Sequence, residues 1–362
     1  MADQQPMIPL YIGTYTRGES QGIYHYQLDP NTGDLTAVGA ATKATNPSYL
    51  AFSPDYRCLF AVNETTDHDG QPTGAVSAFT IDSLTGDLTF LNQQPSHGEA
   101  PCHISVDATG AYLLAANYGS GTVSVFPIEA DGRLRAASEV IQHEGSSVNQ
   151  QRQQGPHAHS ITIDPNNRFA FAADLGIDKV MSYRLDLNEG RLIANNPPSV
   201  SVTPGDGPRH FDFHPNGRYA YLINEIGSTV TAFNYEAESG SLQEIETISS
   251  LPAGFDGRNS TADIHVHPNG KFLYGSNRGH NSIVIYRIDE ATGRLTLIGH
   301  ESTQGEVPRN FAIDPTGRIL LAANQNTDNV VTFWIDQSTG KLTPTGHSAK
   351  VPTPVCLKMI PA

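Results

Sequence analysis

Residues 209–224 read RHFDFHPNGRYAYLIN, and this stretch decides the fold. A short alternation of polar and apolar residues leads into HPNG, and a second apolar run follows the Arg and ends at an Asn. Period-two alternation indicates a β-strand with one face buried. Because Pro fixes φ and Asn-Gly accepts a tight turn, the two runs are expected to pair as an antiparallel hairpin.

The same pattern recurs along the whole chain. Four more copies read SYLAFSPDYRCLFAVN, HSITIDPNNRFAFAAD, ADIHVHPNGKFLYGSN and RNFAIDPTGRILLAAN. A further copy, CHISVDATGAYLLAAN, has Ala108 in place of the turn Pro, and the half-copy VCLKMIPA ends the chain. The turn positions are therefore Pro54, Ala108, Pro165, Pro215, Pro268, Pro315 and Pro361. Regular recurrence of this kind is the mark of a repeat architecture.

A second marker gives the same number of units. Gly-x-Leu follows a polar turn in each unit, where Gly supplies the positive φ of a hairpin and Leu begins the next strand. These glycines are Gly33, Gly86, Gly132, Gly190, Gly240, Gly293 and Gly340. Two independent markers thus indicate seven units.

Each unit holds four short strand-like segments, which is the pattern of a β-propeller blade. The segments PLYIGTY, GIYHYQL and DLTAVG near the N-terminus form three strands without an inner one, and VCLKMI at the C-terminus is a lone inner strand. We therefore predict an all-β, seven-bladed β-propeller of four antiparallel strands per blade, closed where the C-terminal strand joins the N-terminal strands. Residues 1–362 are expected to form one domain, since a β-sandwich or two stacked domains would not explain the missing strand.

Composition narrows the function classes. The 362 residues carry a formal net charge of −15, and no basic footprint for nucleic acid is visible. No run of 18 apolar residues is present, and the N-terminus has neither a basic start nor an apolar run, so neither a membrane span nor a secretory signal is expected. Cys58, Cys102 and Cys356 show no motif spacing, which favours a reducing cytoplasm over a disulfide framework or a cysteine zinc site.

Candidate site residues are those that the repeat does not require. In a propeller, the start of the inner strand and the end of the second strand meet on one face beside the central channel. The residues that break the repeat at these positions are His103, His159, Arg209, His210, Glu225, Asp263, Arg278 and Arg309. His157 lies in the loop that leads to the same face.

These residue types suggest chemistry on an anion. Arginines in a partly dry pocket bind phosphate or carboxylate, and a His beside a carboxylate can act as a base near neutral pH. No Gly-x-Ser-x-Gly elbow, phosphate loop or His-Glu-x-x-His motif is present. His157 and His159 lack a third ligand at a known spacing, so neither a metal nor another cofactor is expected.

The chain resembles the seven-bladed propeller lactonases, a family that includes bacterial 6-phosphogluconolactonases and the fungal carboxy-cis,cis-muconate cyclase. The resemblance runs from YIGTYTRGESQGIY through PHAHS, GPRHFDFHPNGRYAYLINE and ADIHVHPNGKFLYGSNRGHNSI to PRNFAIDPTG. It implies a catalytic site of His159, Arg209, Glu225 and Arg278, with His157 as the alternative to His159. His103, His157, His210, Asp263 and Arg309 are expected to bind the substrate.

The implied reaction is hydrolysis of an anionic sugar-acid lactone, foremost 6-phosphogluconolactone in the pentose phosphate pathway. Arg209 and Arg278 would hold the anionic group and polarise the carbonyl, and His159 or Glu225 would activate water. A lactonising cycloisomerase for a muconate-type dicarboxylate is the alternative enzyme, and a non-catalytic binding propeller is the alternative outside enzymes. We expect a cytoplasmic protein, either a monomer or a weak homo-oligomer, that binds neither nucleic acid nor membrane.

Overall fold

The computed structural model describes residues 5–361, and these residues contain β-strands and turns but no helix. The strands pair into seven antiparallel sheets of four strands, one of which gains β4 as a short fifth strand. No helix suited to crossing a membrane therefore occurs in this range. The chain divides into two compact units, Met1–Pro47 with Ser249–Ala362 (unit 1) and Ser48–Ile248 (unit 2).

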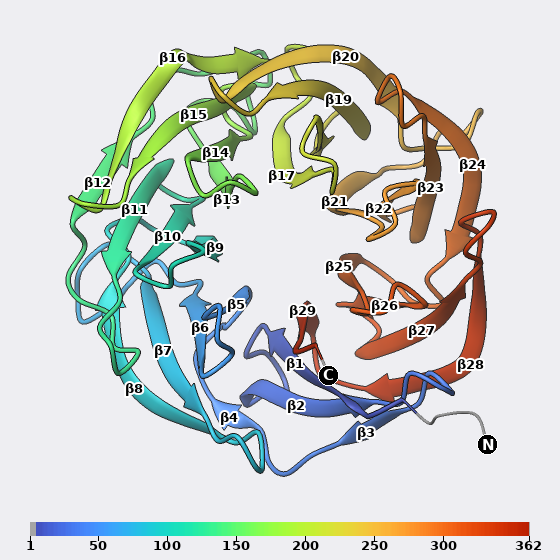
Figure 1. The fold of residues 1–362 in the computed structure, drawn as a ribbon, viewed down its shortest axis with the longest axis horizontal. Helices are drawn as coiled ribbons and strands as arrows, with labels where there is room; N and C mark the ends of the chain where they lie inside the picture. The colour runs from blue at the N-terminus through green and yellow to red at the C-terminus, as the bar shows by residue number, and fades with distance from the viewer. Residues whose placement is uncertain (1–4, 362) are drawn as a thin grey trace. The chain divides into compact units, whose positions relative to one another are not determined.

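Unit 2 contains four consecutive sheets, each built from four strands that follow one another in sequence. The first two sheets are β5 (Leu50–Phe52), β6 (Cys58–Asn63), β7 (Ala75–Ile81), β8 (Leu88–Pro95), then β9 (Pro101–Val106), β10 (Tyr112–Asn117), β11 (Thr122–Pro127), β12 (Glu139–Gln142). The next two are β13 (Ala158–Ile163), β14 (Phe169–Asp174), β15 (Lys179–Asp186), β16 (Arg191–Ser201), then β17 (Pro208–Phe213), β18 (Tyr219–Asn224), β19 (Thr229–Glu236), β20 (Ser241–Ser249). The first strands β5, β9, β13 and β17 lie side by side in this order (Figure 1).

Unit 1 contains the remaining three sheets. Two of them are β21 (Ser260–Val266), β22 (Phe272–Arg278), β23 (Ser282–Ile288), β24 (Leu295–Ser302), and β25 (Pro308–Ile313), β26 (Ile319–Asn324), β27 (Asn329–Ile335), β28 (Leu342–Lys350). The third combines both ends of the chain in β29 (Pro354–Met359), β1 (Ile8–Thr14), β2 (Gly22–Leu28), β3 (Leu35–Ala37) and β4 (Thr42–Lys43).

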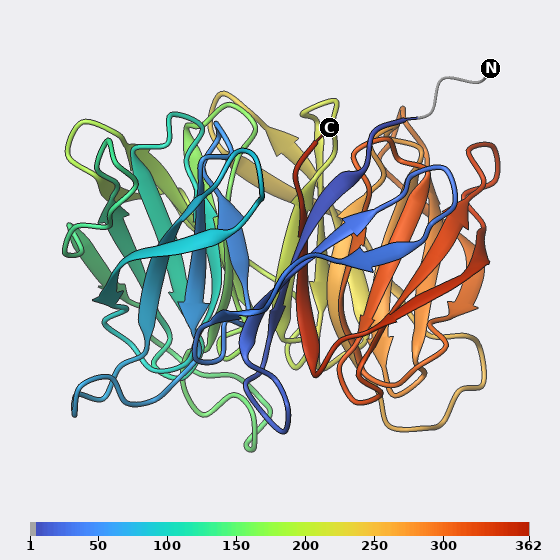
Figure 2. The same cartoon turned by 90° about the horizontal axis from the view of Figure 1, so that it is seen from below.

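The sheet that joins the two ends of the chain confirms the missing-strand argument. β29 pairs antiparallel with β1, with Leu357 opposite Ile12, and the strand order is β29-β1-β2-β3. Figure 2 shows the C-terminal strand, in red, beside the N-terminal strand, in blue. The pairing gives backbone partners to the edge of β1, which would otherwise be an open template for another chain.

The repeated turn is a scaffold, as its recurrence suggests. In the third repeat Asp164 Oδ1 accepts hydrogen bonds from the backbone N–H groups of Arg168 and Phe169, both at 2.6 Å, and so fixes the turn between β13 and β14. Gly240 has a φ of 64°, and a Cβ there would lie 2.4 Å from Cδ1 of Phe169. A larger residue at position 240 would therefore meet both backbone strain and a steric clash.

The Asn that ends the second strand links neighbouring sheets. Asn117 Nδ2 donates to the carbonyl of Ser96 at 3.1 Å, and Asn324 Nδ2 donates to that of Thr303 at 2.9 Å. Asp174 replaces Asn in the third repeat and, being a carboxylate, acts as an acceptor. Its Oδ2 accepts from His143 Nδ1 at 2.6 Å, and its Oδ1 accepts from the backbone N–H of His157 at 2.7 Å.

Apolar side chains fill the space between consecutive sheets within each unit, since a sheet of this kind buries both faces only by stacking. In unit 2, one such layer joins the sheets β9–β12 and β13–β16, and includes Leu114, Val125 and Ile161. In unit 1, another joins the sheets β21–β24 and β25–β28, and includes Tyr274, Phe311 and Phe333. The strand composition and sheet order confirm the predicted seven-bladed propeller class, while the expectation of a single domain stays a prediction.

Candidate active site

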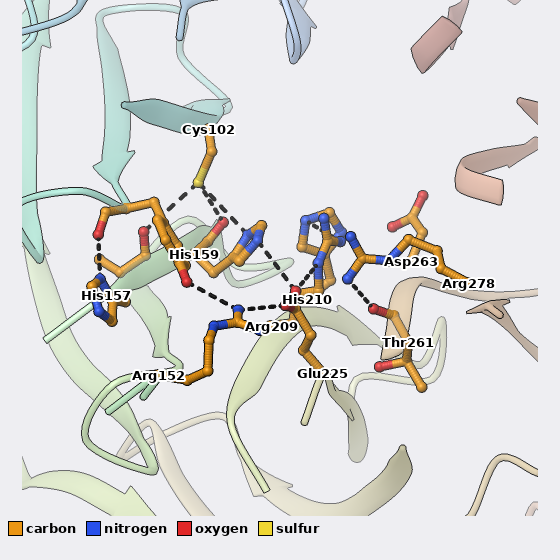
Figure 3. Close-up of polar contacts among 12 residues, drawn as sticks. Cys102, Arg152, His157, His159, Arg209, His210, Glu225, Thr261, Asp263 and Arg278 are labelled. Carbon is orange, nitrogen blue, oxygen red and sulfur yellow. Dashed lines mark hydrogen bonds and ion pairs between the residues drawn. The ribbon is translucent and has the colours of Figure 1, made fainter. Parts of the chain in front are cut away.

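The first strands of unit 2 bring several predicted site residues together. His159 lies on β13, Arg209 and His210 lie on β17, and His103 lies on β9. Glu225 directly follows β18. Because each first strand lies beside the next, the odd residues at their starts meet at one place, as Figure 3 shows for His159, Arg209, His210 and Glu225.

The Glu225 carboxylate is the centre of this cluster. Arg209 Nε donates to Glu225 Oε2 at 3.0 Å, and Arg152 Nη2 donates to Glu225 Oε1 at 2.7 Å. His159 Nε2 lies 3.7 Å from Oε2. Glu225 is only 5% exposed, so its charge depends on these cationic partners for compensation.

Arg209 is enclosed by the residues that it contacts. It is 2% exposed, and its Nη1 donates to His210 Nε2 at 3.1 Å. A guanidinium has no acceptor, so His210 Nε2 carries the lone pair and His210 is neutral with its proton on Nδ1. Arg209 thus holds Glu225, and its predicted role as a ligand of the substrate anion stays a prediction.

His159 and His157 differ in their surroundings. His159 is buried, and its Nδ1 lies 3.6 Å from the Cys102 sulfur. His157 is half-buried, and its Nδ1 donates to the Tyr118 carbonyl at 2.8 Å. Because that bond uses the Nδ1 proton, a neutral His157 presents a lone pair at Nε2.

Rings of His and Tyr lie around the carboxylate. The ring centroids of His159 and His210 are 5.5 Å apart, as are those of His103 and His210. Tyr118 stacks on His157 with centroids 4.6 Å apart, and burial raises the pKa of its hydroxyl. Such a surface combines flat apolar faces with polar edges, which suits a sugar ring that carries both C–H and hydroxyl groups.

Three predicted site residues belong to unit 1. Arg278, the last residue of β22, donates from Nη2 to the Thr261 carbonyl at 2.6 Å (Figure 3). Arg309 lies over the ring of Tyr15, with 5.4 Å from its Cζ to the centroid. Their participation in the same site as Glu225 stays a prediction from the repeat.

Asp263 is also in unit 1, where it connects first strands. Its Oδ2 lies 3.0 Å from His265 Nε2 and accepts a hydrogen bond from Asn310 Nδ2. Asn310 Oδ1 in turn accepts from the backbone N–H of Leu357 on β29 at 2.7 Å. This arrangement braces β21, β25 and β29, and the predicted contact of Asp263 with substrate stays a prediction.

Arg152 is the site residue that repeat analysis missed. It lies in the loop between β12 and β13, and it reaches both Glu225 and the Tyr118 hydroxyl, the latter at 3.0 Å. Burial alone would lower the pKa of Arg152, but the hydrogen bond and charge of Glu225 raise it. This loop is longer than the corresponding loops of the other repeats, so comparing equivalent positions could not select this residue.

Metal binding has no visible basis in the described part of the chain. Residues 5–361 contain no group of three or more His, Cys, Asp or Glu side chains placed to hold a metal ion. The cluster itself offers imidazoles, a carboxylate and guanidiniums, which can exchange protons and bind anions.

Comparison with known proteins identifies the family of the chain. The family model "Lactonase, 7-bladed beta-propeller" matches residues 9–359. The 6-phosphogluconolactonase of Bacillus subtilis is 40% identical over 97% of both chains, and that of Formosa agariphila is 38% identical over 84% of this chain and 86% of its own.

Solved structures of similar proteins match nearly the full length of this chain. The periplasmic gluconolactonase of Pseudomonas aeruginosa superposes with a TM-score of 0.93 at 37% identity, covering 98% of this chain and 99% of its own. A structure from Bacteroides fragilis gives a TM-score of 0.92 at 38% identity over 99% of both chains. With the repeat, the sheet order and the family match in agreement, the chain belongs to the seven-bladed β-propeller lactonase family.

Proposed function

We propose that this protein is a hydrolase that opens the ester of a sugar-acid lactone, with 6-phosphogluconolactone as substrate and 6-phosphogluconate as product. The observation that carries the proposal is the buried Glu225 carboxylate, held by Arg209 and placed 3.7 Å from His159 Nε2. Family membership and the 40% identical 6-phosphogluconolactonase of Bacillus subtilis support it. The reaction places the enzyme in the pentose phosphate pathway.

His159 is the proposed general base. A gap of 3.7 Å between His159 Nε2 and Glu225 Oε2 is beyond a direct hydrogen bond, and a water beside it can contact both atoms. As the water oxygen attacks the lactone carbonyl carbon, its proton passes to Nε2, and Glu225 stabilises the imidazolium that forms. The ring C–O bond then breaks, and the leaving oxygen takes the proton back from His159.

The neighbours of this pair have supporting roles. Arg209 fixes the carboxylate, because its Nε is bonded to Glu225 and its Nη1 to His210. A site that is already hydrogen-bonded needs little reorganisation during the reaction. His103, His210 and Tyr118 supply ring faces and polar edges for the sugar.

The test compares catalysed with spontaneous hydrolysis. Proton release from 6-phosphogluconolactone and from gluconolactone is followed at constant pH, with the buffer rate subtracted. His159→Gln and Glu225→Gln should each lower kcat by about 10²-fold or more, the usual contribution of a general base. His347→Gln, at a half-exposed His on β28, is the matched control and should behave as wild type.

Two results would reject the proposal. One is a wild-type protein that accelerates neither lactone. The other is a wild-type protein that instead closes a muconate-type dicarboxylate to its lactone, which is the activity of the alternative enzyme. Unchanged lactonase kinetics in both site variants would reject the assigned residues while leaving the activity itself intact.

A cytoplasmic location and a monomeric or weakly associated state complete the proposal. All three cysteines are buried free thiols, and a phosphorylated sugar lactone arises where sugar phosphates are metabolised. The Pseudomonas aeruginosa relative is periplasmic, so cell fractionation provides the test of location. Light scattering across a concentration series provides the test of oligomeric state.

A further inference from the structure

The loop between β12 and β13 presents Arg152 in a fixed position. Gln153, next to it, is fully buried, and its Nε2 donates to the Leu175 carbonyl and to Asp178 Oδ1, both at 2.8 Å. Asp178 Oδ1 also accepts from the backbone N–H of Gly207 at 2.7 Å, just before the strand that carries Arg209. One carboxylate thus ties the Arg152 loop to the start of β17.

Arg152 uses only part of its hydrogen-bonding capacity within the protein. Both of its side-chain hydrogen bonds, to Glu225 Oε1 and to the Tyr118 hydroxyl, come from Nη2. Within residues 5–361, neither Nε nor Nη1 has a hydrogen-bond partner, and the side chain is 41% exposed. A guanidinium has five N–H donors, so three of them remain available on the exposed side.

Arg152 also brings a positive charge to the site. Its guanidinium pairs with the Glu225 carboxylate, which pairs with Arg209 as well. The protein as a whole carries −15, so an anionic substrate would gain from a local cation at this position. The Tyr118 hydroxyl accepts from Arg152 and still has its own proton to donate to a nearby anion.

We propose that Arg152, with the Tyr118 hydroxyl, binds the phosphate of the substrate and makes the enzyme selective for phosphorylated over unphosphorylated sugar lactones. This inference rests on the proposed lactonase function and adds the group that recognises the phosphate. A guanidinium fork suits phosphate oxygens, which it can bind in a bidentate manner. Glu225 lies between Arg152 and His159, so the phosphate is held apart from the reacting carbonyl.

Paired kinetics with two substrates test this role. Arg152→Gln should raise KM for 6-phosphogluconolactone by about tenfold to a hundredfold, the usual loss of a hydrogen bond to a charged group. The ratio of kcat/KM for 6-phosphogluconolactone to kcat/KM for gluconolactone should fall by about tenfold or more, because loss of the Arg152 bond to Glu225 affects both substrates while loss of phosphate binding affects only one. Arg152→Lys keeps the charge without the fork and should fall between wild type and Arg152→Gln.

Arg168→Gln is the matched control. Arg168 has a similarly exposed side chain, at 43%, and a similar ion pair, from Nη1 to Glu238 Oε2 at 3.2 Å, but it lies on the turn between β13 and β14. Its replacement should leave both KM values unchanged. A thermal melt of each variant confirms that it is folded.

Calorimetric binding of 6-phosphogluconate and gluconate separates this inference from the proposed function. A wild-type protein that opens no lactone, but binds 6-phosphogluconate with an affinity that Arg152→Gln lowers tenfold, would reject the activity and support the phosphate site. A wild-type protein that opens both lactones equally well would support the activity and overturn the phosphate site. An equal loss of kcat/KM for both lactones in Arg152→Gln would also overturn it, because Arg152 would then act only by positioning Glu225.

Discussion

Arg209 and Glu225 lie 16 positions apart, on and just after two paired strands, and they form a hydrogen-bonded ion pair of 3.0 Å in which both side chains are more than nine-tenths buried. A buried charge without a partner is costly, so each residue requires the other. The pair is therefore both a structural element and the support of the proposed base.

Arg209→Met should destabilise the protein by about 3 kcal/mol, because it removes a buried cationic partner of the Glu225 carboxylate. Urea unfolding measures this loss. Arg57→Met is the control, since Arg57 pairs with Asp55 on the surface, where solvent screens the attraction and the pair stabilises the fold little. An equally small effect at both positions would show that the buried pair is not a source of stability.

Replacement of Arg278 tests whether a residue of unit 1 that was selected by its position in the repeat contributes to activity. Arg278→Gln should lower kcat/KM for 6-phosphogluconolactone by at least about tenfold if it contacts the substrate. Arg287→Gln, on the neighbouring strand β23, removes an Arg that lies over the Phe272 ring and should leave the kinetics unchanged. Equal kinetics in the two variants would remove Arg278 from the site.

Asp206 is expected to make the stability of the folded protein depend on pH, with a sign that follows from its pKa. Burial, then the nearby Asp178 carboxylate, raise the pKa of Asp206 above its ordinary 3.8, so ionisation of this group disfavours the folded state. Asp206→Asn should therefore gain stability relative to wild type as the pH rises above about 4, and the gain should vanish below that value. Urea unfolding at a series of pH values measures the difference.

Asp55 is expected to affect the pH dependence of stability in the opposite direction from Asp206. Hydrogen bonds from the Ser53 hydroxyl and Arg57 lower the pKa of Asp55 to about 2, so its ionised form favours the folded state. Asp55→Asn should lose stability at neutral pH, and this loss should shrink as the pH falls from about 4 toward 2. Stability differences of the same sign for both variants would contradict the assigned causes.

Replacement of Asp174 tests why the third repeat departs from the Asn found at the end of the second strand in most repeats. Asp174→Asn removes one carboxylate acceptor from a buried set that includes His143 and the backbone N–H of His157. A stability loss of about 1–3 kcal/mol is expected, the cost of an unsatisfied buried polar group. Asn224→Asp is the reciprocal variant, and a loss there as well would show that each repeat requires its own residue type.

Most of the fold could be predicted from the sequence because its signals are local and repeated. The HPNG turn of residues 214–217 and the alternating residues beside it specify a hairpin without reference to the rest of the chain. The seven Gly-x-Leu turns specify the number of sheets in the same way. The pairing of β29 with β1 followed from counting strands, since one sheet was otherwise incomplete.

The site was only partly predictable. His159, Arg209, His210 and Glu225 were found because they interrupt a regular pattern, and unit 2 brings them together. The burial of Arg209 and its bond to Glu225 could not be inferred, because side-chain partners depend on how neighbouring strands pack.

The sequence by itself determined the strands, the turns and their repetition, because these depend on residues close together in the chain. Only the tertiary structure decided which side chains share the Glu225 carboxylate. Arg152 lies 73 positions from Glu225, in a loop that is longer than its equivalents in the other repeats. Its position depends on the buried bonds of Gln153 to Leu175 and Asp178, which are contacts that no local pattern encodes.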